Sequence, residues 1–127
     1  MGMLIDGSWR DDDQRIVDGA YRRAPSAFGE AIPETVVEAM VLQPGRYHLV
    51  ISNSCPWCMR VALTRQLKGL EGRLALHVTG GTRVQGYPAD HGHAWPVPGM
   101  DRKITHLHEL YTITAADFTG RVTVPLL

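Results

Sequence analysis

Apolar and polar residues follow a regular pattern only after a turn signal at Pro44 and Gly45. Residues 47–52 form an apolar, β-rich run, and residues 74–78 form a second one. Between them, residues 59–68 contain no glycine or proline, and apolar side chains recur there at roughly helical spacing. A strand, a helix and a strand in so short a span predict a βαβ unit, in which the two strands are parallel.

The residues before this turn predict little regular structure. Residues 1–44 are rich in Gly, Pro, Asp and Arg, and three prolines interrupt any long element. A short helix is predicted near residues 35–40. We therefore divide the chain into an irregular N-terminal extension, residues 1–44, and one domain, residues 45–127.

Three further segments follow the predicted βαβ unit. Residues 80–102 predict a long loop, which in a compact domain usually has a functional role or is mobile. Thr105 is a candidate N-cap for a following helix. Residues 121–127 close the chain as an extended, β-branched run.

Composition and charge exclude several classes of function. The chain has 127 residues, of which 44% are hydrophobic and 20% charged, as expected for one soluble domain. Because 13 Lys and Arg balance 13 Asp and Glu, we expect no nucleic-acid partner. No stretch reaches the roughly 20 apolar residues of a membrane span, and the N-terminus lacks a signal-peptide pattern. We expect a cytoplasmic protein with no membrane partner.

The two cysteines form a C-P-W-C motif between the first predicted strand and the helix. The free N–H groups and dipole of a helix N-terminus stabilise a thiolate, and such sites lower a cysteine pKa by one to several units from about 8.5. Cys55 is therefore predicted to be the attacking thiol, and Cys58, one turn further on, an optional resolving thiol. Pro56 stiffens the turn and Trp57 offers a ligand an aromatic surface. Arg60 either adds positive charge or is simply solvated.

Two other interpretations of the cysteines stay open at this point. A C-x-x-C motif is half of some zinc sites, and the second half would be His91 with His93 or His106 with His108. Neither H-x-H pair has the spacing of common zinc modules. Alternatively, both cysteines are inert core residues. The strand-to-helix setting favours redox chemistry, and we expect no metal.

Five segments after the extension carry a family resemblance. They are residues 45–49, 52–60, 67–71, 108–111 and 120–125. In order and approximate spacing they resemble the glutathionyl-hydroquinone reductases, also called the Xi class of glutathione transferases. The resemblance implies an α/β, thioredoxin-like domain of the kind found at the N-terminus of glutathione transferases.

The resemblance also implies an activity. Family members remove glutathione from glutathionylated hydroquinones, so glutathione would be the co-substrate and quinone-type small molecules the partners. Cys55 matches the family's catalytic cysteine, which attacks the glutathione sulfur and holds a mixed disulfide until a second glutathione frees it. Cys58 departs from the alanine common in the family, and this second thiol favours the chemistry of dithiol glutaredoxins.

Further site residues follow from the same resemblance. Pro125 matches the family's cis-proline, and the backbone of the preceding Val124 would pair with the cysteinyl part of glutathione. In the family a loop tryptophan helps to hold glutathione. Trp95 is the candidate for this role, and Tyr87 is the alternative.

The family implies more structure than this sequence supplies. In the family, the rest of the sheet and an all-helical domain follow the position of Leu127. We therefore expect a fold truncated before the end of the sheet, whose free edge invites a homodimer or an intertwined oligomer. The catalytic competence of this short chain is open. Two alternatives to the reductase remain, a glutaredoxin-like dithiol–disulfide oxidoreductase and a non-catalytic interaction module.

Overall fold

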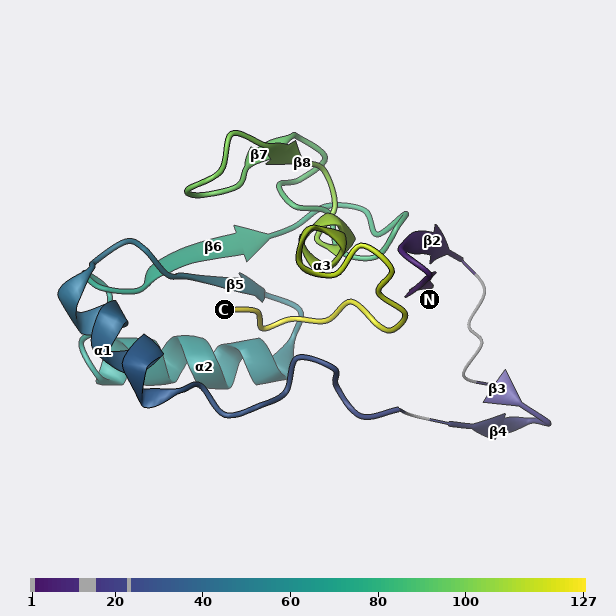
Figure 1. Ribbon diagram of the computed structural model, residues 1–127, viewed down its shortest axis with the longest axis horizontal. Coiled ribbons are helices and arrows are strands. Elements are labelled where there is room, and N and C mark those ends of the chain that lie inside the picture. The colour runs from purple at the N-terminus through teal and green to yellow at the C-terminus, as the bar shows by residue number, and fades with distance from the viewer. Residues whose placement is uncertain (1, 12–15, 23) are drawn as a thin grey trace.

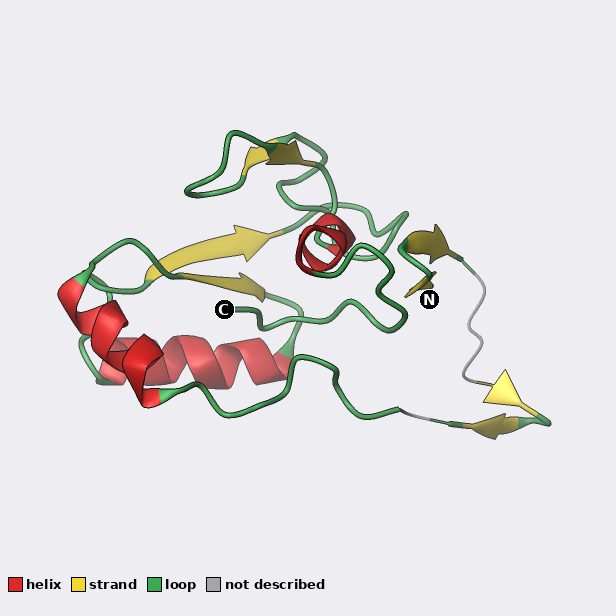
Figure 2. Cartoon of the chain, in the orientation of Figure 1, coloured by secondary structure: helices red, strands yellow, loops and turns green. Residues whose placement is uncertain are grey.

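A computed structural model describes residues 2–11, 16–22 and 24–127 (Figure 1). Short strands and three helices are joined by long loops (Figure 2). In chain order the elements are β1 (Met3–Ile5), β2 (Ser8–Arg10), β3 (Ile16–Val17), β4 (Ala20–Tyr21), α1 (Glu34–Leu42), β5 (His48–Ser52), α2 (Pro56–Leu67), β6 (Ala75–Thr79), β7 (Trp95–Pro96), β8 (Lys103–Ile104) and α3 (His108–Thr114).

The predicted βαβ unit is confirmed. β5 and β6 pair in parallel with Val50 opposite His77, and α2 connects them. β5 is buried along most of its length, as expected of a strand in the middle of an α/β fold. α2 begins at Pro56, which occupies its first turn, where a fixed φ and a missing N–H are tolerated.

The C-terminal residues lie along the free side of β5. The N–H of Val50 donates to the carbonyl of Leu126 at 2.8 Å, and the N–H of Leu126 donates back at 3.0 Å. Within the extended run predicted for residues 121–127, this antiparallel bridge is the part that pairs with a β-strand. The peptide bond between Val124 and Pro125 is cis, as the family resemblance implies.

The first part of the N-terminal extension is a hairpin rather than an irregular segment. β1 and β2 pair antiparallel around Asp6 and Gly7, which both have positive φ. Asp-Gly is a preferred pair in a two-residue hairpin turn. Strands of three residues are too short to show alternation, so this dipeptide was the available sequence signal. Leu4 is fully buried and pairs with Gly120, which fixes the hairpin to the domain.

Two predictions about the remaining elements had different outcomes. The short helix near residues 35–40 is confirmed and lies within α1. The predicted cap at Thr105 is wrong, because α3 begins three residues later and Leu107 is its N-cap. The carboxylate of Glu109 instead accepts hydrogen bonds from the N–H groups of Thr105 and His106, at 2.8 and 3.0 Å. The long loop also contains a small hairpin formed by β7 and β8. The sequence did not predict this hairpin, because the many glycines and prolines of the loop leave no strand pattern.

Replacing Leu107 by alanine is expected to destabilise the fold strongly. This side chain is fully buried in the core cluster. Removing a buried leucine side chain costs about 2–5 kcal/mol through lost burial and the cavity that remains. Urea unfolding followed by circular dichroism measures the change. The matched control is Leu67→Ala, because Leu67 is 77% exposed and its loss should change the free energy of unfolding by less than about 0.5 kcal/mol. Equal effects of both substitutions would contradict this view of the core.

Candidate functional site

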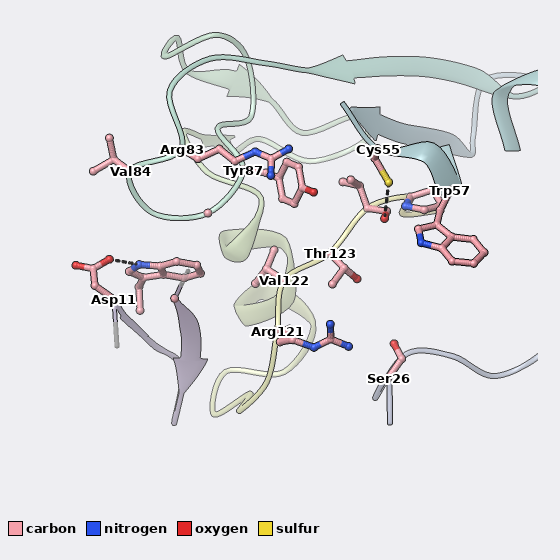
Figure 3. Close-up of a pocket in the computed structure, with 15 residues that line it drawn as sticks. Asp11, Ser26, Cys55, Trp57, Arg83, Val84, Tyr87, Arg121, Val122 and Thr123 are labelled. Atoms are coloured by element: carbon pink, nitrogen blue, oxygen red, sulfur yellow. Dashed lines mark hydrogen bonds between the residues drawn. The ribbon is translucent and has the colours of Figure 1, made fainter. Parts of the chain in front are cut away.

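Cys55 lies at the junction between β5 and α2. It is the N-cap residue of α2, its N–H donates to the carbonyl of Ser52 at 3.0 Å, and its own carbonyl accepts from the N–H of Met59 at 3.2 Å. Its side chain is 9% exposed. The thiol faces the cis-proline loop and donates to the carbonyl of Val124 at 3.6 Å (Figure 3). The fold thus places one reactive sulfur between a helix N-terminus and a backbone carbonyl.

The pKa of the Cys55 thiol is lowered. Burial by itself acts in the opposite direction and raises this pKa. It is outweighed by groups that stabilise the thiolate, namely the backbone N–H and thiol of Cys58, the N–H of Trp57 and the positive charge of Arg83. At neutral pH Cys55 therefore has a larger thiolate fraction than an ordinary cysteine.

The second cysteine has the opposite character. Cys58 is fully buried on α2, and burial raises its pKa to about 11, with further contributions from the hydrogen bond to Cys55 and its charge. The N–H of Ser52 donates to its sulfur at 3.4 Å, which partly offsets these effects. At neutral pH Cys58 is therefore a protonated thiol.

Alkylation of Cys55 by iodoacetamide near neutral pH is expected to be faster than alkylation of the same thiol in urea. Because the pKa of Cys55 is lowered, its rate should fall with decreasing pH only below that lowered pKa. Cys58 should stay unmodified, since it is buried and its pKa is about 11. Peptide mapping by mass spectrometry from about pH 5 to about pH 10 measures both rates. A midpoint for Cys55 equal to that of the unfolded chain would contradict the expectation.

Cys55 opens into a cavity of about 790 Å³. Trp57, Val124 and Pro125 surround the sulfur end, while Trp9 and Asp11 line the cavity from the N-terminal hairpin. Figure 3 shows Asp11 and Cys55 on opposite sides of this space. A cavity of this volume holds a ligand of several hundred daltons.

Two arginines line the cavity. Arg83 donates to the hydroxyl of Ser54 at 2.6 Å and lies over the ring of Tyr87, 4.0 Å from its centroid. Arg121 lines the opposite side, next to Val122 (Figure 3). Among residues 2–11, 16–22 and 24–127, neither guanidinium forms an ion pair with a carboxylate. Asp11 is the one carboxylate among the described residues that line the cavity, so the two guanidinium groups leave the lining with net positive charge, which favours an anionic ligand.

The structure brings most of the predicted site residues together. Trp57, Val124 and Pro125 join Cys55 in the cavity, and Trp57 is 64% exposed. Arg60 does not line the cavity; its guanidinium lies over the ring of Trp57, 4.5 Å from the centroid. Pro56 is the first residue of α2 and shapes its start. Cys58 lies behind Cys55, closed off from solvent.

Trp95 and Tyr87, the two candidates for the loop aromatic, lie in different places. Trp95 stacks on His77 of β6, with ring centroids 4.1 Å apart, and does not line the cavity. Tyr87 does line it, under the guanidinium of Arg83. Burial raises the pKa of Tyr87, so its hydroxyl remains protonated at neutral pH and available as a hydrogen-bond donor.

Several residues that line the cavity were not predicted from the sequence. Among them are Trp9, Arg83 and Arg121. Arg121 lies within the segment 120–125, so its position beside the cis-proline was the available signal. Trp9 and Arg83 lie in segments without periodicity, where no signal distinguishes them from surface residues.

Metal-ligating clusters and membrane-spanning helices are both absent from the described part of the chain. Within it, no group of three His, Cys, Asp or Glu side chains is arranged to hold a metal ion. His106 and His108 stack on each other, with centroids 5.5 Å apart. None of the helices in this part is long and apolar enough to span a bilayer.

Two curated proteins match the entire chain. Glutathionyl-hydroquinone reductase PcpF of Sphingobium chlorophenolicum is 34% identical over 135 residues, and glutathionyl-hydroquinone reductase YqjG of Escherichia coli is 32% identical over 136 residues. The chain is a relative of the glutathionyl-hydroquinone reductases. It spans 40% and 42% of the length of these two relatives. The likeness predicted for residues 45–127 is thereby confirmed and extends to the N-terminal residues. No family model matches the chain.

Solved structures of Xi-class glutathione transferases give the same result for the fold. The Xi-class enzyme of Natrialba magadii is 31% identical, with a TM-score of 0.60 over 98% of this chain and 37% of its own. The glutathione-bound structure of YqjG from Escherichia coli is 30% identical, with a TM-score of 0.60 over the same shares of the two chains. The fold is the thioredoxin-like fold of these glutathione transferases, as the sequence predicted.

Proposed function

We propose that this chain provides the glutathione-binding and thiol-exchange site of a glutathionyl-hydroquinone reductase. The observation that carries the proposal is the Cys55 thiol, which has a lowered pKa and faces the carbonyl of Val124 inside a cationic cavity. The two relatives that match the whole chain are named for this activity, and one solved neighbour contains glutathione. Cys55 is the proposed catalytic residue.

The proposed reaction begins with the Cys55 thiolate. It attacks the glutathione sulfur of a glutathionylated hydroquinone, and a sulfur–sulfur bond replaces the sulfur–carbon bond to the ring. The ring carbon keeps the electron pair and takes up a proton, so the free hydroquinone leaves. A second glutathione thiolate then attacks the mixed disulfide, which releases oxidised glutathione and restores the Cys55 thiolate.

The residues of the cavity fit glutathione as a substrate. Glutathione is an anionic tripeptide, and Arg83 and Arg121 give the cavity positive charge without carboxylate partners among the described residues. Val124 offers its backbone next to the reacting sulfur, just before the cis-proline, where it could pair with the backbone of a peptide. The exposed ring of Trp57, beside Cys55, offers a stacking surface for the aromatic ring of the hydroquinone.

Cys58 has a second role in the proposal, as an intramolecular thiol that displaces glutathione from Cys55. Its sulfur is within hydrogen-bonding reach of Cys55, one helical turn away. The relatives that match the whole chain are reductases rather than glutaredoxins, so we place this step inside the reductase cycle. A glutathione thiolate then attacks the Cys55–Cys58 disulfide, and a further glutathione attacks the resulting mixed disulfide, which releases oxidised glutathione and restores both thiols. We propose a reducing, cytoplasmic location, because the cycle consumes reduced glutathione. The oligomeric state stays a prediction.

A single-turnover experiment tests the proposed function. The reduced chain is mixed with an equal amount of a glutathionylated hydroquinone, and intact mass spectrometry and chromatography follow the protein and the quinone product together. For each hydroquinone released we expect one chain to carry either a glutathione adduct or the Cys55–Cys58 disulfide that replaces it. In Cys58→Ser, which cannot form that disulfide, the adduct and the hydroquinone should appear at equal rates. Hydroquinone release with no adduct on Cys58→Ser, or no reaction while iodoacetamide still modifies Cys55 rapidly, would contradict the proposal.

A further inference from the structure

The hairpin β1–β2 is joined to the segment that leads into the cis-proline loop. Leu4 and Gly120 exchange two backbone hydrogen bonds of 2.9 Å, and the N–H of Gly7 donates to the carbonyl of Phe118 at 3.0 Å. The side chain of Thr119 accepts from the N–H of Asp6 at 2.8 Å. The hairpin and the loop opposite Cys55 therefore form one connected unit.

Within this unit, Trp9 is held in one position. Its ring stacks on His108, with centroids 5.3 Å apart and an angle of 24° between the planes. Its indole N–H donates to the carboxylate of Asp11 at 2.8 Å. Gly86 lies against the ring edge, where an added Cβ would be 2.8 Å from Cη2. Because the indole N–H is already hydrogen-bonded to Asp11, Trp9 offers only an aromatic surface to the cavity that it lines.

The residues that line the cavity therefore differ between its two sides, with the reactive thiol on one side and the aromatic surface of Trp9 on the other. Cys55 lies at one side and Asp11, the partner of Trp9, at the other, with Tyr87 and Val122 between them (Figure 3). A small disulfide reagent that reaches the sulfur occupies only the Cys55 side. A disulfide of a tripeptide is longer and extends further, towards Trp9.

We infer that Trp9 determines the preference of Cys55 for glutathione-sized disulfides over small ones. This inference rests on the proposed function and adds a specificity residue to it. Trp9 acts by packing against the part of the ligand remote from the sulfur. It therefore raises the rate at which Cys55 reacts with long disulfides and leaves the intrinsic reactivity of the thiol unchanged. Buried aromatic side chains contribute large contact areas to binding, which makes the expected effect measurable.

The test compares three reagents on four proteins. Second-order rates of Cys55 modification by oxidised glutathione, hydroxyethyl disulfide and iodoacetamide are measured for the wild type, Trp9→Ala, Trp9→Phe and Trp95→Ala. Trp95 is the matched control, because it is a part-buried tryptophan that stacks on His77 outside the cavity. Thermal unfolding of each protein shows that it is folded.

We expect Trp9→Ala to lower the rate with oxidised glutathione by about tenfold and to leave the other two rates within about twofold. Trp9→Phe, which keeps an aromatic ring on His108, should lose less, and Trp95→Ala should match the wild type. If Trp9→Ala does not fold, the inference depends on Trp9→Phe, whose rate with oxidised glutathione must fall selectively.

Three outcomes overturn the inference, and the first two of them are distinct from failure of the proposed function. If the wild type prefers oxidised glutathione and the folded Trp9 variants keep that preference in full, the role of Trp9 is wrong and the proposed function stands. If the variants lose all three rates equally, Trp9 is structural only. If the wild type itself shows no preference for oxidised glutathione over hydroxyethyl disulfide, the proposed function fails and the role of Trp9 fails with it.

Discussion

Cys55→Ser is expected to abolish formation of the glutathione adduct and release of hydroquinone. A serine hydroxyl is not ionised at neutral pH, whereas the pKa of the Cys55 thiol is lowered by its neighbours and the helix N-terminus. Loss of the nucleophile from a covalent mechanism commonly costs a factor of about 10³ or more. The single-turnover assay with a glutathionylated hydroquinone measures both products.

The control for this experiment is a thermal unfolding measurement, which shows whether the variant is folded. Serine differs from cysteine by one atom, and Cys55 is slightly exposed, so the variant should unfold within a few degrees of the wild type. An adduct that still forms at an undiminished rate in Cys55→Ser would assign the reaction to Cys58. That outcome would contradict the burial of Cys58 and its raised pKa as well as the proposed mechanism.

The central part of the fold was predictable because its signals are local. The β-rich runs that became β5 and β6 and the proline-started helix between them are each written in a few consecutive residues. A cysteine at a strand-to-helix junction is placed at a helix N-terminus by chain connectivity alone. The reactive end of the site therefore follows from the sequence before any tertiary contact is known.

The rest of the cavity depends on long-range contacts, which leave no local pattern. Trp9 reaches the site because Leu4 pairs with a residue 116 positions later, Gly120. The choice between Trp95 and Tyr87 depends on the path of the loop. Pairing of β7 with β8 turns Trp95 towards His77, while hydrogen bonds from Leu107 to Tyr87 and from Ala89 to Thr105 hold Tyr87 near the cavity. Glycine and proline content predicts that a loop exists and says nothing about its path.

The misplaced helix start has a similar cause. Thr105 is a good N-cap residue by type, but the backbone between residues 104 and 107 is engaged in other pairing. Ala89 donates to the carbonyl of Thr105, and Leu107 donates to the carbonyl of Tyr87. These contacts delay α3 until the chain leaves the loop, and Glu109 in its first turn accepts hydrogen bonds from the N–H groups of Thr105 and His106, which precede the helix.

Cys58→Ser is expected to change the product of the reaction with oxidised glutathione. In the wild type, Cys55 first takes one glutathione, and the bond between the two sulfurs then becomes the target of Cys58. The negative charge of the Cys55 thiolate and its hydrogen bond contribute to the high pKa of Cys58, and both disappear when Cys55 is modified. Cys58 is then held one helical turn from the disulfide and attacks it, which releases glutathione and leaves a bond between Cys55 and Cys58.

The serine variant cannot take this second step, so the adduct should persist. An intramolecular reaction between groups held at short range has a large effective concentration, and we expect the lifetime of the adduct to increase by at least about tenfold in Cys58→Ser. Intact mass spectrometry after mixing with oxidised glutathione, with no reduced glutathione present, measures this lifetime directly. The first step should keep its rate within a few-fold, because the hydroxyl of serine still donates a hydrogen bond towards Cys55. If the adduct decays equally fast in both proteins, Cys58 is a buried neighbour that tunes the pKa of Cys55 and takes no covalent part in the cycle.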